Sequence, residues 1–260
     1  MCIMNTIRIT SPSTNATEGQ TDFYAKTCQF PHMALLRIFT GNKSHICGGA
    51  LVDDIHIITA AHCFPKGWTF VDVSLGGTNS SVAKATFQIN TTNVHLHKAF
   101  KTLNSSFLLY ENDAAFLVLP RPINANKCIR PITMATHNDT FYSSCFMVGW
   151  EINSSKGKNT AVLKWENVNV LPEASCGVIA TKFRNRRICA SDLHLHGGKQ
   201  TCQGGEGGSL VCFKKDKRAV LAGFTSSEAV CQHGISPKNH KLSLKPGHDL
   251  SQELSHEQRI

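Results

Sequence analysis

The sequence predicts an all-β protein of the sandwich or barrel type. From about residue 30 to residue 230, short apolar or alternating runs are separated by clusters of Gly, Asn, Pro and Ser, which is the pattern of β-strands joined by turns. No internal repeat interrupts this pattern. With 260 residues, 41% of them hydrophobic and 17% charged, the chain is long enough to bury a sizeable core. This balance excludes a disordered chain.

Nine runs are expected to form the strands of this fold. They span residues 33–39, 50–58, 70–75, 87–94, 114–119, 145–150, 161–170, 210–213 and 219–225. The Pro120-Arg121-Pro122 segment lies between the fifth and sixth runs and is a natural linker. We therefore expect two halves, at about 29–120 and 130–231.

The two ends of the chain differ in composition from this body. Residues 1–28 are rich in Ser, Thr, Asn and Gly and have no apolar period, so they are expected to form a flexible leader. Residues 232–260 are dominated by His, Lys, Ser and Glu with scattered leucines. They are predicted to form a polar tail outside the core.

The charge of the chain favours an anionic partner. The net charge is +9 and the isoelectric point is near 9.1. No nucleic-acid motif is present, so anionic glycans rank ahead of nucleic acid. The most basic segments, 182–187 and 214–218, are either solvated loops or a heparin-like binding surface. No apolar run approaches the length of a membrane span, so none is expected.

Eleven cysteines and seven Asn-X-Ser/Thr sequons indicate a secreted, disulfide-bonded glycoprotein. The cysteines form no CxxC pair and no zinc-site spacing, so disulfides are the better interpretation. The expected glycosylation sites are Asn15, Asn42, Asn79, Asn90, Asn104, Asn138 and Asn153. The first residues lack the apolar h-region of a signal peptide, so either the secreted form starts elsewhere or export fails.

Two histidine pairs have the two-residue spacing of metal ligands on a strand. They are His95 with His97 and His194 with His196. No acidic or cysteine third ligand accompanies either pair, so solvated loop histidines are the preferred interpretation. Neither a metal nor a cofactor is expected.

Three separated segments carry a recognisable chemistry. Residues 47–63 read CGGALVDDIHIITAAHC, residues 112–119 read NDAAFLVL, and residues 202–212 read CQGGEGGSLVC. In sequence and order they resemble the histidine motif, aspartate segment and nucleophile loop of the trypsin and chymotrypsin family of serine proteases. The resemblance covers about residues 29–231. It places His62, Asp113 and Glu206 at the three positions of the catalytic triad.

The resemblance implies a trypsin-like double six-stranded β-barrel. After Cys231 the family's last strand and terminal helix are replaced by the polar tail, so both are expected to be missing. Family pairing implies disulfides that join Cys47 to Cys63, Cys145 to Cys212, Cys176 to Cys189, and Cys202 to Cys231. A bond from Cys2 to Cys128 is similar to the leader tether of some family zymogens. It leaves Cys28 as the odd cysteine, free or paired with another chain.

The nucleophile of such a protease is missing from this sequence. A serine protease needs a hydroxyl that a neutral imidazole deprotonates, and Glu206 has none. A carboxylate beside His62 also favours the imidazolium, which is a poor base. Gly204 is expected to supply one amide of the oxyanion hole. An amide donor without an attacking group gives no covalent turnover.

The activation switch and the substrate cleft also depart from the family. The aspartate that receives the new N-terminus in the family is replaced by Gly205, and residues 16–22 contain no basic cleavage site. At the specificity pocket, Gln200 lies at the expected base, and Ser226-Ser227-Glu228 replaces the family's Ser-Trp-Gly. These changes are either drift after loss of function or a remodelled ligand groove.

The sequence therefore predicts a catalytically inactive serine protease homologue with a protein-binding, glycan-binding or regulatory role. Two alternatives stay open. One is a residual or atypical serine-type endopeptidase, for instance with Glu206 acting as a base on water. The other is the non-functional product of a degenerating protease locus.

Overall fold

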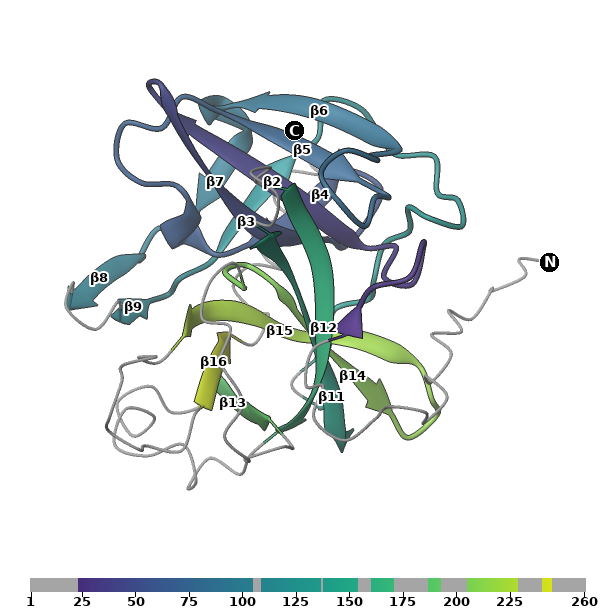
Figure 1. Ribbon diagram of the computed structural model, residues 1–260. Helices are drawn as coiled ribbons and strands as arrows, with labels where there is room; N and C mark the ends of the chain where they lie inside the picture. Colours follow the sequence, from purple (N-terminus) through teal and green to yellow (C-terminus); the bar gives the residue numbers. More distant parts are fainter. Residues whose placement is uncertain are drawn as a thin grey trace.

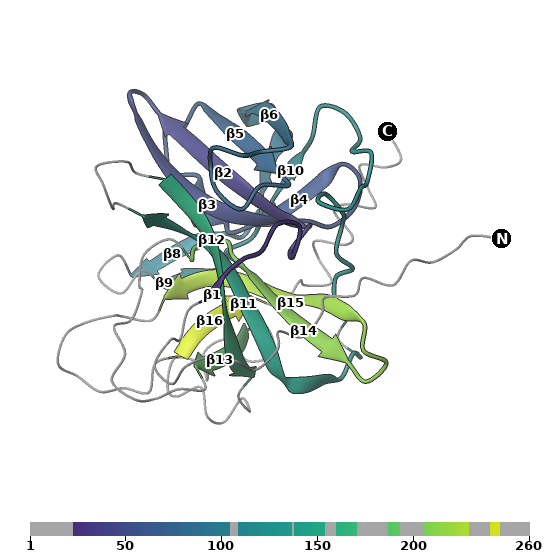
Figure 2. The same ribbon diagram turned by 45° about the vertical axis from the view of Figure 1, so that its right-hand side comes forward.

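Two antiparallel β-sheets, each curled into a barrel, form the described part of the protein (Figures 1 and 2). The computed structural model describes residues 23–104, 109–136, 138–153, 160–170, 187–192, 205–228 and 240–244. Within these residues there is no α-helix, and the helical turns are the short 3-10 segments η1 and η2. The views show the two sheets stacked one above the other, with the first half of the chain in one and the second half in the other. The predicted double β-barrel is confirmed.

The first barrel contains seven strands in the order β6-β5-β2-β3-β4-β10-β7. Their bounds are β2 Met33–Thr40, β3 Lys43–Leu51, β4 His56–Thr59, β5 Phe70–Leu75, β6 Ala85–Asn90, β7 Val94–Leu96 and β10 Ala115–Val118. The outermost strands, β6 and β7, are consecutive in the chain and are separated only by η2 (Thr91–Asn93). If the continuous segment β6-η2-β7 is counted as one position, the sheet has six positions, and this segment links its two edges. Strand β5 alternates buried and half-buried residues, as expected for a strand with one face on a core.

The second barrel is closed entirely by strand pairing. Its strands are β11 Phe141–Asn153, β12 Thr160–Val170, β13 Arg187–Asp192, β14 Ser209–Lys214, β15 Ala219–Glu228 and β16 His240–Leu244. They pair in the order β12-β11-β14-β15-β16-β13, and β13 pairs again with β12. A short strand, β1 (Phe23–Tyr24), adds to the outer side of β12. Outside the two barrels, β8 Lys101–Asn104 and β9 Leu109–Glu111 form a separate hairpin.

The prediction that the last barrel strand is missing is wrong. Residues 240–244 form β16, which pairs with both β15 and β13 and occupies the place of the last strand. In this short run Leu242 and Leu244 alternate with polar residues, which is a strand pattern that the polar composition around it conceals. The pairing leaves no open edge between β15 and β13. The expected loss of the terminal helix lies outside the described residues.

The predicted leader is too long. Residues 23–28 belong to the folded body, because β1 pairs with Trp165 and Lys164 of β12. In addition, a disulfide joins Cys28 to Cys128. The proposed bond from Cys2 to Cys128 and the proposed free Cys28 are therefore both wrong. The cause is proximity, since the segment before β2 lies against the loop that follows the linker and brings the two Cα atoms to 4.2 Å.

Buried side chains form one main cluster that spans both barrels and a second, smaller cluster in the second barrel. The barrels are joined by specific contacts: the Trp150 indole N–H donates a hydrogen bond to the carbonyl of Ala34 at 2.9 Å, and Asn79 forms a β-bridge with Val162. Disulfides join Cys47 to Cys63 within the first barrel and Cys145 to Cys212 within the second. These contacts hold the loops between the barrels in fixed positions.

We predict that peptide mapping under non-reducing conditions recovers three linked pairs. They are Cys28 with Cys128, Cys47 with Cys63, and Cys145 with Cys212. Each closed loop is expected to stabilise the fold by about 2 to 4 kcal/mol. Detection of free thiols at both Cys47 and Cys63, or of a peptide linking Cys2 to Cys128, would contradict this arrangement.

Candidate active site

His62 is held in position by a short helical turn at the end of β4. The turn η1 (Ala61–Cys63) follows β4 directly, and its residues Ala61 and Cys63 are buried. The disulfide to Cys47 anchors the turn to β3. The carbonyl of Cys63 also contacts His45 Nε2 at 2.8 Å. The backbone around His62 is thus fixed from two sides, which limits the orientations of its imidazole.

Asp113 lies just before β10 and orients that imidazole. Its carboxylate is 0% exposed and accepts three hydrogen bonds. The His62 backbone N–H donates to Oδ1 at 2.8 Å, and His62 Nδ1 donates to Oδ2 at 2.6 Å. The Ser226 hydroxyl of β15 also donates to Oδ2 at 2.6 Å. A buried carboxylate with this many donors is fully satisfied, so the pair is rigid.

Glu206 faces the other nitrogen of the imidazole. Its Oε2 lies 3.7 Å from His62 Nε2, which is an ion pair longer than a hydrogen bond. The Glu206 side chain is 44% exposed, so the carboxylate is at the surface of the site. The structure therefore brings together His62, Asp113 and Glu206 from three distant segments.

The turn that carries Glu206 requires glycine at the next position. Gly207 has φ of +70°, and a Cβ there would lie 2.3 Å from the carbonyl oxygen of Gly48. Its N–H donates to the carbonyl of Thr225 at 2.9 Å. The carbonyl of Glu206 in turn accepts the N–H of Gly48 at 2.7 Å. These bonds tie the turn to both barrels and set the direction of the Glu206 side chain.

The electrostatics of the site favour a protonated histidine. Burial by itself lowers the pKa of His62, but the hydrogen bond to Asp113 and the negative charges of Asp113 and Glu206 outweigh it and raise the pKa to about 9. The His62 imidazolium holds the pKa of Glu206 below its ordinary value, although burial of the carboxylate acts in the opposite direction. At neutral pH the site therefore contains one imidazolium between two carboxylates.

Tyr110 covers one face of the imidazole. It comes from β9, and its ring lies parallel to that of His62, with centroids 4.6 Å apart and planes 5° apart. A cation stacked on an aromatic face is stabilised further. The pKa of Tyr110 is raised by burial and by the charges of Asp113 and Glu206. Sequence reasoning missed this residue, and its position three residues before Asp113 was the available signal.

The structure describes only part of the predicted cleft. Gly205 lies directly beside Glu206, and its carbonyl accepts the N–H of Gly208 at 2.8 Å. Ser227 and Glu228 lie in β15, where only their backbone is described. Gly204 and Gln200 lie outside the described residues, as do Cys176, Cys202 and Cys231. Cys189 lies in β13 with its backbone alone described.

The sequons fall on turns and strand ends wherever they are described. Asn42 lies in the β2–β3 turn and Asn79 in the β5–β6 loop, Asn90 and Asn104 end β6 and β8, Asn138 precedes β11, and Asn153 ends it. Of these, Asn42, Asn90 and Asn138 have exposed side chains. Asn15 lies outside the described residues.

The other candidate sites have structural partners where they are described. The His95 ring stacks on Phe116, and His97 Nδ1 accepts the N–H of Ala99 at 3.1 Å, whereas His194 and His196 lie outside the described residues. Within the described ranges no group of three His, Cys, Asp or Glu side chains could hold a metal ion.

The basic segment at the β14–β15 turn is partly neutralised. Lys214 pairs with Asp139, and Arg218 pairs with Asp216 at 2.6 Å. Lys215 and Lys217 remain exposed beside them. The other basic segment, 182–187, lies outside the described residues except for Arg187, which starts β13.

The chain belongs to the trypsin family. A family model for Trypsin matches residues 21–239. Coagulation factor IX from Cavia porcellus is 32% identical over 213 residues, which cover 76% of this chain and 71% of that protein. Trypsin-1 from Salmo salar is 29% identical over 186 residues, which cover 71% of this chain and 73% of that protein. Trypsin-2 from the same organism is 29% identical over 208 residues, which cover 79% of this chain and 84% of that protein.

One further finding concerns membranes. No helix in the described part of the chain has the length and apolar character needed to cross a bilayer.

We predict that His62 titrates near pH 9. The expected readout is the pH dependence of its ring-proton NMR signals, with a midpoint at about 9 in the wild-type chain. In Glu206→Gln, loss of one of the two neighbouring carboxylates should lower this midpoint by about one to two pH units. Glu166→Gln, on β12, removes a carboxylate elsewhere and serves as the control. A wild-type midpoint near 6.5 would contradict the described geometry.

Proposed function

We propose that this protein is a catalytically inactive serine protease homologue, secreted and N-glycosylated, that acts through binding. The observation that carries the proposal is the group that faces His62 Nε2, which is the carboxylate of Glu206 at 3.7 Å. Acyl transfer at this position requires a hydroxyl or thiol that can attack a carbonyl carbon. The expected covalent intermediate cannot form through a carboxylate–imidazolium pair that lacks such a group.

The charge state of His62 supports the same conclusion. A general base must be unprotonated before it accepts a proton, and its best pKa lies near the working pH. His62 has its pKa raised to about 9 by Asp113 and Glu206, so it is an imidazolium at pH 7. In this form it cannot act as the base. The described geometry thus argues against both parts of the first catalytic step, which are attack by a nucleophile and removal of its proton by His62.

The sequence next to Glu206 supports a loss that extends beyond one residue. Gly205 has no side chain to receive a new N-terminus, and residues 16–22 offer no basic cleavage site. Oxyanion-hole amides contribute about a hundredfold or more to the rate of acyl transfer. If Gly204 is one of these amides, its position in this chain lacks the ion pair that would order it.

The retained fold is the argument for a binding role. The second barrel is closed by strand pairing, the disulfides at Cys47 and Cys145 are in place, and both oxygens of the Asp113 carboxylate accept hydrogen bonds. A fold with a complete core can present surfaces without catalysing a reaction. A partner protein or an anionic glycan is the proposed ligand class, in line with the net charge of +9.

The test is a comparison of the purified full chain with active trypsin. We expect no labelling by a fluorophosphonate probe and no cleavage of a broad peptide library. Cleavage of peptides without labelling would instead favour Glu206 acting as a base on water. Disulfide-complete, soluble protein from a secretory host, followed by affinity capture of a partner, would separate a binding protein from the product of a degenerating locus.

A further inference from the structure

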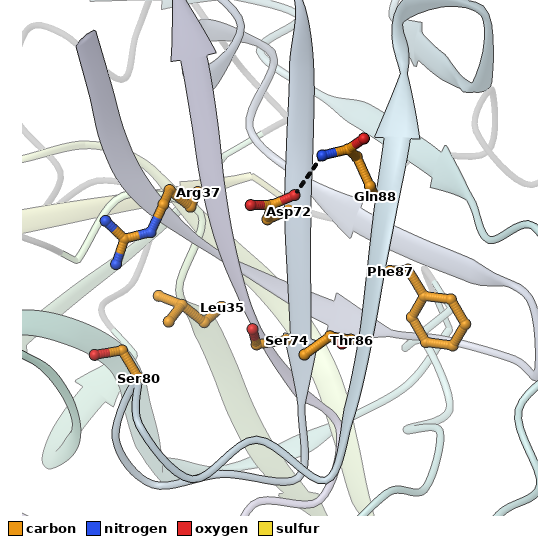
Figure 3. A pocket seen from close by; sticks show the side chains of 8 residues that line it. All are labelled: Leu35, Arg37, Asp72, Ser74, Ser80, Thr86, Phe87 and Gln88. Atoms are coloured by element: carbon orange, nitrogen blue, oxygen red, sulfur yellow. Dashed lines mark hydrogen bonds between the residues drawn. The ribbon is translucent and has the colours of Figure 1, made fainter. Parts of the chain in front are cut away.

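A polar pocket lies on the outer face of the first barrel, formed by strands that carry none of the triad residues. It spans β2, β5 and β6 and has a volume of about 380 Å³ (Figure 3). Its size lies at the lower end of the range for small-molecule sites. The lining residues are Leu35, Arg37, Asp72, Ser74, Ser80, Thr86, Phe87 and Gln88.

Strand register arranges the outward side chains in rows across the face. Arg37, Asp72 and Gln88 are direct neighbours on the three strands, and so are Leu35, Ser74 and Thr86. The residues between them on each strand point into the core. Ser80 reaches the same pocket from the loop that joins β5 to β6. Phe87 also borders the pocket, but its ring is buried and points away from the other labelled side chains in Figure 3.

The charged row offers both hydrogen-bond donors and acceptors. Asp72 accepts one hydrogen bond from the Gln88 amide at 3.2 Å, which leaves acceptor capacity on its carboxylate. Arg37 is half-buried and makes no hydrogen bond or ion pair with any residue that the structure describes. Although the two charges are neighbours across strands, each remains available to a ligand.

The remaining surfaces of the pocket supply hydroxyls and apolar contact. Ser74, Ser80 and Thr86 each carry a hydroxyl that both donates and accepts. Leu35 is part of the buried core and forms an aliphatic floor beneath them. In the next row along the strands, Phe39 and Phe70 form a half-buried stacked pair with centroids 4.3 Å apart.

We infer that this pocket binds the terminal units of a neutral oligosaccharide. Sugar hydroxyls donate to a carboxylate and accept from a guanidinium at the same time, whereas sugar C–H faces pack on aliphatic and aromatic side chains. A sulfated ligand would be attracted by Arg37 but repelled by its neighbour Asp72, so the row does not select for an anion. An apolar ligand would leave the polar lining unpaired. The inference goes beyond the proposed function, because it adds a neutral-glycan site to the protein and anionic-glycan partners proposed there, and it does not depend on the loss of catalysis.

Two sources can supply this ligand chemistry. One is a glycan of another molecule. The other is an N-glycan of this chain, because the sequon Asn79 directly precedes Ser80 and Asn90 lies opposite Phe70 at the edge of the same face. The experiment therefore uses the full chain from a secretory host before and after enzymatic removal of its N-glycans.

The probes are diacetylchitobiose and mannobiose as neutral sugars and a sulfated heparin disaccharide as the anion. We expect saturation-transfer NMR to detect at least one neutral probe, and Asp72→Asn and Arg37→Met each to weaken it about tenfold. Asp54→Asn, an exposed carboxylate outside the pocket, is the matched control and should change nothing. Binding only after deglycosylation identifies the chain's own glycan as the occupant.

The sign of the Asp72→Asn effect separates the ligand classes. Removing this carboxylate weakens a neutral sugar but strengthens a sulfated one, because it removes a repulsive charge. Detection of the heparin disaccharide but of neither neutral probe, with Asp72→Asn strengthening the heparin signal, overturns the inference. So does the absence of neutral-sugar binding in both glycosylation states, with thermal unfolding confirming that each variant is folded. Silence of the wild-type chain towards fluorophosphonate bears only on the proposed function.

Discussion

Acidification from pH 6.5 to pH 4.5 is expected to remove about 2 to 3 kcal/mol from the free energy of unfolding because of one residue, His32. His32 precedes β2 and is 2% exposed. Its Nε2 has no hydrogen-bond partner among the described residues. A buried imidazole without a partner strongly disfavours the charged form.

The direction follows from the two pKa values. Burial lowers the pKa of His32 from 6.5 to about 3 in the folded protein, whereas the unfolded chain keeps the ordinary value. Below pH 6.5 the unfolded chain binds a proton that the folded chain excludes, so stability falls until about pH 3. The full loss is about 4 to 5 kcal/mol, at about 1.4 kcal/mol per pH unit.

The two shifted groups of the candidate site, both among the described residues, change stability little within this window. His62 has a raised pKa, so its contribution is complete below pH 6.5 and is lost only as the pH rises towards 9. Glu206 has a lowered pKa, so its contribution is lost only below its ordinary value of 4.5. The interval from pH 6.5 to pH 4.5 therefore reports on His32 with little interference.

The measurement is urea unfolding at several pH values between 6.5 and 4.5. Two apolar replacements of different shape, His32→Phe and His32→Leu, should each flatten the pH dependence relative to the wild-type chain. Because both remove the titrating group, a difference in packing between them does not affect the slope. An equal slope in wild type and both variants would show that His32 is not the responsible group.

Much of the fold follows from the sequence because its strands have one face on a core. The runs at residues 33–39, 70–75 and 161–170 correspond closely to β2, β5 and β12, whose inward positions are apolar. The pattern predicts one strand at residues 50–58, yet the chain turns within this run. There Asp53 accepts hydrogen bonds from the N–H groups of Ile55 and His56 and separates β3 from β4.

The elements that were missed lack this apolar signal. The first half of β3 is polar, and it is a strand because all its residues pair with β2. Hairpin β8–β9 lies outside both barrels. Strand β16 is five residues long, and its short alternation of leucines with polar residues is concealed by the polar tail around it, so its pairing with β13 and β15 is the clearer signal. Tertiary pairing decides these segments more than any local pattern does.

The family motifs predict the three residues of the candidate site, but they do not predict the residues that surround it. His62, Asp113 and Glu206 lie together as the three motifs predict. The role of Ser226 as a donor to Asp113 and the stacking of Tyr110 on His62 depend on distances between strands that are remote in sequence. The unpartnered His32 is likewise invisible in composition, because the sequence alone does not say which histidine loses its solvent.

Restoring the hydroxyl alone, with Glu206→Ser, is expected to leave the chain unreactive. The substitution places a serine at the position that faces the His62 imidazole. The hydrogen bonds from His62 and Ser226 to Asp113 are already present. It also removes one carboxylate beside His62, which lowers the pKa of the imidazole towards the range of a useful base. A protein with an otherwise intact site would therefore regain acyl transfer.

We expect the remaining defect to lie in the activation switch. Gly205 cannot pair with a new N-terminus, and no cleavage site in residues 16–22 creates one. We expect that loss of this ion pair leaves the oxyanion amides without their ordering contact, at a cost of about a hundredfold or more in rate. We expect labelling of Glu206→Ser by a fluorophosphonate probe to stay at the background of the wild-type chain, since the probe reports nucleophile activation without requiring a matched peptide.

The minimum set expected to recover labelling combines three changes. They are Glu206→Ser, Gly205→Asp, and an Arg-Ile-Val-Gly-Gly leader cleaved before the assay. Because β16 closes the second barrel, the substituted chain has a complete sheet on which to order the site. Adding Asp113→Asn to this set should abolish the recovered labelling, since the imidazole then loses its orienting carboxylate. Strong labelling of Glu206→Ser alone would mean that the oxyanion amides are already ordered, and the account of a lost activation switch would then be wrong.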